Sequence, residues 1–214
     1  MCGRYALIGI DELKDEYGWP ADFEFMPNYN IAPTQNMPVV TDKGLEIMRW
    51  GIIPAWAKDE KIGYRLINTR SETVFDKPMW KGIVTKKRCL IPANGFYEWQ
   101  KQGDSKQPFY IRTKDQKLFM FAGIWETWKH EGIEINTYSI LTTEPNREMV
   151  SIHDRMPVIL SKQDHVKWLA ADGREQIESL LLPYQDNGLE MYPVGKDVNS
   201  VKVNEAKLIL PVGR

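Results

Sequence analysis

Alternating apolar and polar residues recur in short runs along most of the chain, a pattern typical of β-strands with one buried face. The clearest case is the stretch 38–50, in which two such runs flank the turn-forming residues Asp42, Lys43 and Gly44. This arrangement predicts a β-hairpin. Similar apolar runs predict further strands at residues 89–91, 96–99, 108–112, 117–128, 134–142 and 208–210.

Helical patterns are fewer and shorter than the strand patterns. The segment 11–17 is expected to form a helix that Asp11 caps and that ends at the run Gly18-Trp19-Pro20. Two further short helices are expected at 161–169 and 175–182. The helices therefore account for only a minor part of the predicted fold.

Proline and glycine mark two loops that carry apolar residues. Residues 26–34 are expected to form a connecting loop, because Pro27 and Pro33 each push the preceding residue into an extended conformation. Residues 50–58 are expected to form a second loop, and exposed apolar loop residues usually contact a binding partner. Since no repeat or linker divides the chain, the sequence predicts one α+β domain over 1–214. We expect it to be strand-dominated, with twisted antiparallel sheets in a barrel-like core and flanking helices.

The composition limits the kinds of partner that the protein can have. Of 214 residues, 43% are hydrophobic and 27% charged, and the formal net charge is −1. This balance argues against tight binding of duplex DNA through bulk positive charge, and it leaves room for a local basic cleft. Most of the eight Trp, nine Tyr and seven Phe are expected in the core, and a minority are candidates for stacking against bases.

Cysteine, histidine and glycine patterns exclude several kinds of site. Cys2 and Cys89 are the only cysteines and lie far apart in sequence, so no disulfide framework is expected. The cysteines and the three histidines lack metal-ligand spacing, and no glycine-rich phosphate loop is present, so we expect neither a metal nor a cofactor. The sequence also lacks a signal segment and any apolar run of about 20 residues, which favours a cytoplasmic location.

The start of the chain carries unusual chemistry. Removal of Met1 would place Cys2 at the amino terminus, with an α-amine of reference pKa about 8 beside a thiol of reference pKa about 8.5. Both nucleophiles are then partly available near neutral pH. The alternative interpretation is an incidental cysteine on a frayed chain end, since chain ends are usually poorly ordered.

Three polar residues follow one another at alternate positions. Asn68, Arg70 and Glu72 stand at i, i+2 and i+4, so in an extended segment their side chains point the same way. This arrangement fits one wall of a polar site. It fits equally well the solvated face of a half-buried strand.

Two further polar features stand where a strand-rich core would not need them. Glu98 lies inside the aromatic strand 96–99, where burial should raise the pKa of its carboxyl group and suit it to acid–base catalysis. His153 is followed by Asp154 and Arg155, which is a candidate polar cluster. A structural histidine held by its neighbours is the alternative interpretation.

Six sequence blocks, taken together, are more specific than any single residue. They are Met-Cys-Gly-Arg-Tyr at 1–5, Tyr-Asn-Ile-Ala-Pro at 29–33, Trp-Gly-Ile-Ile-Pro-Ala-Trp-Ala-Lys-Asp at 50–59, Asn-Thr-Arg-Ser-Glu-Thr at 68–73, Arg-Cys-Leu-Ile-Pro-Ala-Asn-Gly-Phe-Tyr-Glu-Trp at 88–99, and His-Asp-Arg-Met-Pro at 153–157. The blocks resemble those of the SOS-response-associated peptidase (SRAP) family. They occur in the family order and span nearly the whole chain.

This resemblance implies a DNA-repair protein that recognises abasic sites in single-stranded DNA and cross-links itself to them through its N-terminal cysteine. It implies that loss of Met1 exposes Cys2, a step that the family name attributes to autoproteolysis, and that an aminopeptidase could equally perform. The residues that the resemblance assigns to the active site are Cys2, Asn68, Glu98 and His153. Those it assigns to DNA are Arg4, Arg70 and Arg155 for phosphates, Pro33 and Trp56 against the bases, and, by its spacing from His153, Thr142.

The sequence departs from the family pattern in two places. Thr69 stands where the family commonly has alanine, which should not affect the chemistry. The segment 198–204 keeps only part of the usual polar pattern. A DNA contact from this tail is therefore an open question at the level of sequence.

Three classes of function are compatible with these residues. The first is an enzyme that cross-links itself to abasic single-stranded DNA by lyase-like Schiff-base chemistry, ending in a thiazolidine on Cys2, and that associates with the nucleoid when DNA is damaged. The second is a cysteine-type N-terminal-nucleophile amidohydrolase or peptidase acting on a small amide, with the amine of Cys2 as its base. The third is a non-covalent nucleic-acid module. In each case we expect a monomer without a membrane partner.

Overall fold

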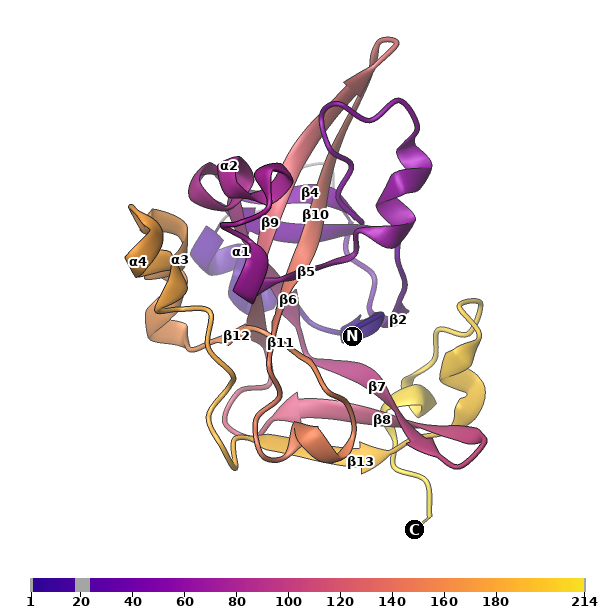
Figure 1. Cartoon of the computed structure of the whole chain (residues 1–214). Coiled ribbons are helices and arrows are strands. Elements are labelled where there is room, and N and C mark those ends of the chain that lie inside the picture. Colours follow the sequence, from indigo (N-terminus) through magenta and orange to yellow (C-terminus); the bar gives the residue numbers. More distant parts are fainter. Residues whose placement is uncertain (1, 18–23, 214) are drawn as a thin grey trace.

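The computed structural model describes residues 2–17 and 24–213. The predicted end of the first helix at Gly18-Trp19-Pro20 lies outside these residues. Within the described ranges, the strands form two sheets, and Figure 1 shows the amino terminus between them.

The larger sheet closes on itself. Strand β10 pairs with β4 and also with β9, and the order β10-β4-β3-β6-β9 therefore returns to its start as a five-stranded barrel. The predicted barrel-like α+β core is confirmed, although β10 pairs with β4 and with β5 in the parallel direction. The barrel strands are β3 (Asn36–Thr41), β4 (Gly44–Trp50), β6 (Arg88–Ala93), β9 (Phe119–His130) and β10 (Ile133–Thr143).

The second sheet lies below the barrel in Figure 1 and has the order β13-β8-β7-β1-β2. The chain passes from the barrel to this sheet at Asn94, whose side chain accepts a hydrogen bond from the Ile8 N–H at 2.6 Å. The strands of this sheet are β1 (Arg4–Leu7), β2 (Asn28–Ile31), β7 (Gly95–Gln102), β8 (Ser105–Thr113) and β13 (Leu189–Pro193).

Short elements complete the described chain. The α-helices are α1 (Asp11–Tyr17), α2 (Pro78–Lys86), α3 (His165–Ala170) and α4 (Arg174–Glu178). Three short strands, β5 (Asn68–Arg70), β11 (Met156–Pro157) and β12 (Ile159–Leu160), pair with barrel strands. The 3-10 turns are η1 (Glu60–Arg65), η2 (Ser71–Thr73), η3 (Met149–Ser151), η4 (Lys162–Asp164), η5 (Lys196–Asn199) and η6 (Ala206–Ile209).

The predicted hairpins and the first helix are confirmed, and several details are corrected. The expected connector at 26–34 contains strand β2, because Asn28–Ile31 pairs antiparallel with β1. The expected strand at 208–210 is wrong: this stretch belongs mostly to η6, where Leu208 alone is buried against the second sheet. Helix α2 was not predicted, although Pro78 suits a first helical turn.

Aromatic side chains fill the region where the two sheets meet. Tyr5 from β1 and Tyr138 from β10 are fully buried, and their hydroxyl oxygens lie 2.7 Å apart in a hydrogen bond. The Tyr5 ring packs edge-on against Trp50 and Phe121, with centroid distances of 5.1 and 6.0 Å. Edge-to-face packing of this kind adds about 1 kcal/mol per pair to the burial energy. The start of β1 is therefore held on a rigid core.

Candidate active site

Cys2 lies two residues before the start of β1 and is fully buried. Its sulfur is 3.7 Å from the Arg4 carbonyl oxygen, a weak S–H donor contact. The side-chain Nδ2 of Asn68 donates a 2.7 Å hydrogen bond to the Cys2 carbonyl oxygen. The described part of the amino terminus is therefore an ordered, enclosed segment and not a frayed end.

Asn68 is placed by strand β5, which pairs with the barrel strand β10 opposite Ile140. Its neighbour Thr69 points inward, and the Thr69 and Ser139 hydroxyls lie 3.0 Å apart. The Asn68 Oδ1 atom is buried and has no hydrogen-bond partner among the described residues. A buried acceptor of this kind is costly unless a ligand or water satisfies it.

Glu98 is 2% exposed and projects from β7, the strand that pairs with β1. Burial raises the pKa of its carboxyl group, and the nearby charge of His153 partly opposes that shift. Burial also raises the pKa of the Cys2 thiol, and the charge of Glu98 raises it further. The expected desolvation of Glu98 is therefore confirmed, and the thiol lies within its electrostatic reach.

His153 follows η3 in a turn that fixes its ring. Its Nδ1 atom accepts a 3.0 Å hydrogen bond from the Arg155 backbone N–H and lies 2.8 Å from Asp154 Oδ1. The side chain is 26% exposed. Through its charge interaction with Glu98, His153 belongs to the same group as Cys2 and Asn68, so the fold brings these four predicted residues together.

Arg155 makes more protein contacts than a free phosphate-binding arginine would. Both terminal nitrogens bind the Glu72 carboxylate, at 2.6 and 2.8 Å, and Nη2 also donates to the Thr142 carbonyl oxygen at 2.6 Å. Such bidentate pairs are the strong form of ion pair. Glu72 reaches Arg155 from η2, so the expectation that Asn68, Arg70 and Glu72 share one extended strand is wrong beyond Arg70.

The other two arginines differ in exposure. Arg70 is exposed at the end of β5, opposite Thr142 in the register with β10. Arg4 is half-buried, and its Nη1 donates to Asn30 Oδ1 at 2.7 Å and to the Val198 carbonyl oxygen at 2.8 Å. Of the three predicted phosphate contacts, Arg70 is thus the most accessible to a polyanion.

The two predicted apolar contacts lie on loops. Trp56 is 67% exposed, an unusual position for so large an apolar side chain. Pro33 is half-buried and precedes Thr34, which has a left-handed backbone with φ of 76° and whose N–H bonds the Trp50 carbonyl oxygen at 2.8 Å. This bond ties the Pro33 turn to the end of β4, from which the Trp56 loop departs.

Sequence reasoning missed Asn30 and did not assign a role to Glu72. Asn30 is 1% exposed and joins Arg4 to the C-terminal segment. Its position inside the 29–33 block was the available signal. The described residues contain no group of three or more His, Cys, Asp or Glu that could hold a metal ion.

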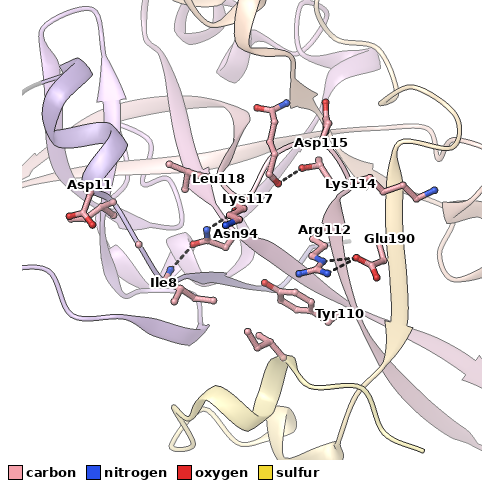
Figure 2. A pocket seen from close by; sticks show the side chains of 15 residues that line it. Ile8, Asp11, Asn94, Tyr110, Arg112, Lys114, Asp115, Lys117, Leu118 and Glu190 are labelled. Carbon is pink, nitrogen blue, oxygen red and sulfur yellow. Dashed lines mark hydrogen bonds and ion pairs between the residues drawn. The ribbon is translucent and has the colours of Figure 1, made fainter. Parts of the chain in front are cut away.

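A cavity of about 670 Å³ lies away from these residues, toward the opposite ends of β7 and β8. Figure 2 shows Asn94 and Tyr110 at its wall and the ion pair between Arg112 and Glu190 beside them. Cys2 and Glu98 do not line it. Its charged groups are already paired or solvent-exposed, so it offers no evident reactive centre.

The sequence model of one protein family, SOS response associated peptidase (SRAP), matches residues 1–201 of this chain. The chain belongs to the SRAP family. Among curated SRAP relatives, abasic site processing protein YoaM of Bacillus subtilis is 44% identical, covering 98% of this chain and 97% of the relative. Abasic site processing protein HMCES of Gallus gallus is 30% identical, covering 99% of this chain and 78% of the relative.

The SRAP chain is also similar to solved structures. A protein from Bacteroides thetaiotaomicron superposes with a TM-score of 0.91 at 28% identity, covering 99% of this chain and all of the other. The similarity to this structure therefore covers the whole fold. Within the described residues no helix is long and apolar enough to cross a membrane.

Proposed function

We propose that this protein, acting as one domain over residues 1–214, recognises abasic sites in single-stranded DNA and links itself to them covalently through Cys2. The observation that carries the proposal is a fully buried Cys2, held by Asn68 and electrostatically coupled to the buried acid Glu98. Its relatives YoaM and HMCES are abasic site processing proteins, which supports the same substrate.

The first chemical step requires a free α-amine on Cys2, so Met1 must be removed. An abasic deoxyribose opens part of the time to an aldehyde at C1′. The Cys2 nitrogen adds to C1′, and loss of one water from the resulting carbinolamine gives a Schiff base. A Glu98 carboxyl group with a raised pKa can donate the proton that the departing water needs.

The second step closes a ring. The Cys2 sulfur adds to C1′ of the Schiff base, the S–H proton passes to nitrogen, and a five-membered thiazolidine results. The thiol is covalently tethered to the reacting carbon, so its effective concentration is far higher than that of any thiol in solution. An internal residue such as Cys89 lacks the adjacent α-amine and cannot complete this ring.

The neighbouring side chains have separate roles in this proposal. Asn68 holds the Cys2 carbonyl oxygen and offers its unpartnered Oδ1 to the amine or a sugar hydroxyl. His153 protonates the sugar oxygen during ring opening or holds the 3′-phosphate. Arg70, the most exposed of the three arginines, makes the first phosphate contact, and Arg4 and Arg155 make the others. Trp56 and Pro33 lie against the bases.

Denaturing gels with abasic single-stranded DNA test this proposal. We expect a slow-migrating covalent band for the wild-type protein and for Cys89→Ala, the control that removes the other thiol. Cys2→Ser should lose the band. A stable band of wild-type intensity in Cys2→Ser would refute the assignment of the thiol.

The amidohydrolase alternative is less well supported. It needs an activated Cys2 thiol, whereas burial and Glu98 both raise the pKa of this thiol and keep it protonated. Amide turnover in the absence of DNA would favour this alternative.

A further inference from the structure

The Asn30 side chain forms hydrogen bonds with two separate parts of the chain, strand β1 and the C-terminal segment. It lies on β2, is 1% exposed, and accepts the Arg4 Nη1 bond through Oδ1. Its Nδ2 lies within hydrogen-bond distance of three carbonyl oxygens, those of Val198 (3.4 Å), Ser200 (2.9 Å) and Val203 (2.8 Å). Two amide protons are thus shared among three acceptors of the C-terminal segment.

The segment 196–204, here called the C-terminal strap, runs along β2, the outermost strand of the second sheet. The Tyr29 N–H donates to Asn204 Oδ1 at 2.7 Å, and Trp99 Nε1 donates to Asn199 Oδ1 at 2.8 Å. The strap therefore covers a sheet edge that would otherwise expose unpaired backbone groups.

The strap reaches the proposed site through Arg4. The same Arg4 nitrogen that Asn30 binds also donates to the Val198 carbonyl oxygen, so one atom joins β1, β2 and the strap. Arg4 is two residues from Cys2, and its own carbonyl oxygen accepts the Cys2 thiol contact. Movement of the strap is therefore expected to move the Arg4 guanidinium group.

We propose that Asn30 is a positioning residue, which clamps the strap so that Asn30 and Val198 together fix the Arg4 guanidinium for a DNA phosphate beside Cys2. This inference rests on the proposed function. It gives the tail a role that needs no DNA contact from the tail itself.

The bonds that Asn30 makes to the strap do not depend on the identity of the strap residues. All three strap acceptors of Asn30 are backbone carbonyls, which any residue supplies. The SRAP match itself ends at residue 201, before Val203 and Asn204. The bonds from Asn30 therefore place no demand on the side chains at positions 198, 200 and 203, whereas Asn199 and Asn204 hold the strap through their side chains.

The test uses a single-stranded oligonucleotide with a tetrahydrofuran abasic analogue, which lacks an aldehyde and so binds reversibly. Asn30→Ala should weaken binding about tenfold, the effect of losing one charged hydrogen bond. Arg4→Gln should weaken it similarly and flatten the salt dependence by about 0.7 in log–log slope, one phosphate contact. The double variant should bind no more weakly than Arg4→Gln alone.

Additive losses in the double variant, or wild-type binding by Asn30→Ala, would overturn the proposal. Gln107→Ala is the matched control, because Gln107 holds the Val194 carbonyl oxygen of the preceding segment at 2.9 Å and does not contact Arg4. We expect Gln107→Ala to bind the analogue as the wild type does. A tenfold loss of affinity in Gln107→Ala would show that any loosening of the tail weakens binding, which would contradict a specific role of Asn30.

Amide hydrogen exchange tests the coupling between Arg4 and the strap without DNA and without a change at Asn30. The amides of Ser200 and Val203 bond to the Asp197 and Ser200 carbonyl oxygens and report strap opening. Arg4→Gln should speed their exchange at least about fivefold, since coupling between the two sites is reciprocal. Unchanged exchange would contradict the clamp, whereas absence of a cross-link with true abasic DNA would contradict only the proposed function.

Discussion

At the scale of single residues, Cys2 and Glu98 form a pair of buried acids. Burial raises the pKa of both groups, and a charge on Glu98 makes ionisation of the thiol still less favourable. The pair therefore favours states with at most one negative charge. This electrostatic balance suits a reaction that begins at the neutral amine, with the thiol entering second.

The raised pKa of Glu98 has a consequence for stability. Its neutral form is favoured in the folded state, so its contribution is complete below the unfolded pKa of about 4.3 and is lost as pH rises through the folded pKa. We expect Glu98→Gln, which cannot ionise, to gain in melting temperature relative to the wild type as pH rises from about 4. Thermal unfolding at a series of pH values measures this difference, and a difference that shrinks with pH would show that Glu98 is not desolvated.

Asn68 provides a second prediction at this scale. Asn68→Ala removes the donor to the Cys2 carbonyl oxygen, so the cross-linking rate at saturating DNA should fall at least about tenfold, while reversible binding of the abasic analogue changes little. Denaturing gels of reactions quenched at successive times give the cross-linking rate. The control is Asn36→Ala, an exposed asparagine at the start of β3. Equal cross-linking rates in Asn68→Ala and Asn36→Ala would show that Asn68 has no role in the reaction.

Single residues were also where sequence reasoning succeeded and failed most clearly. The burial of Glu98 follows from its aromatic neighbours, and it was predicted. The pairing of Arg155 with Glu72 was not, because the two are 83 positions apart and no local pattern reports which carboxylate reaches which arginine. The same holds for Asn30, whose partners lie in the C-terminal strap.

At the scale of elements, strand pairing places the site. Residue Arg4 of β1 lies opposite Tyr97 of β7, which sets Cys2 near Glu98, and β5 adds Asn68 by pairing with β10. Periodicity predicted the hairpins β3–β4, β7–β8 and β9–β10. It could not predict that β5 and β10 run parallel, because such pairing depends on contacts between segments far apart in sequence.

The loop that carries Trp56 gives a prediction at this scale. A base stacked on an aromatic ring contributes about 1–3 kcal/mol, so Trp56→Ala should weaken binding of the abasic oligonucleotide at least about fivefold. Because the side chain is 67% exposed, the melting temperature should not change. Ile133→Ala, at a 56% exposed position on the β9–β10 hairpin, is the control for loss of exposed apolar surface. Equal binding by both variants would exclude stacking by Trp56.

At the scale of the whole molecule, a closed barrel and a second sheet hold the amino terminus between them (Figure 1). The formal charge of −1 agrees with a protein that binds DNA through a few local cations and gains persistence from a covalent bond. The fold class could be predicted from strand periodicity and from the family resemblance. The barrel closure could not, since it depends on the pairing of β10 with both β4 and β9.

The central claim is that the α-amine and the thiol of Cys2 react together with one abasic aldehyde. The most direct measurement is the intact mass of the isolated protein–DNA adduct. The wild-type chain is compared with an extended chain, in which one glycine is inserted between Met1 and Cys2 and stays in place after Met1 is removed. The account predicts a wild-type adduct whose mass equals Met1-free protein plus abasic DNA less one water, and no stable adduct from the extended chain. A stable adduct of the extended chain would contradict it, as would a wild-type adduct that retains Met1.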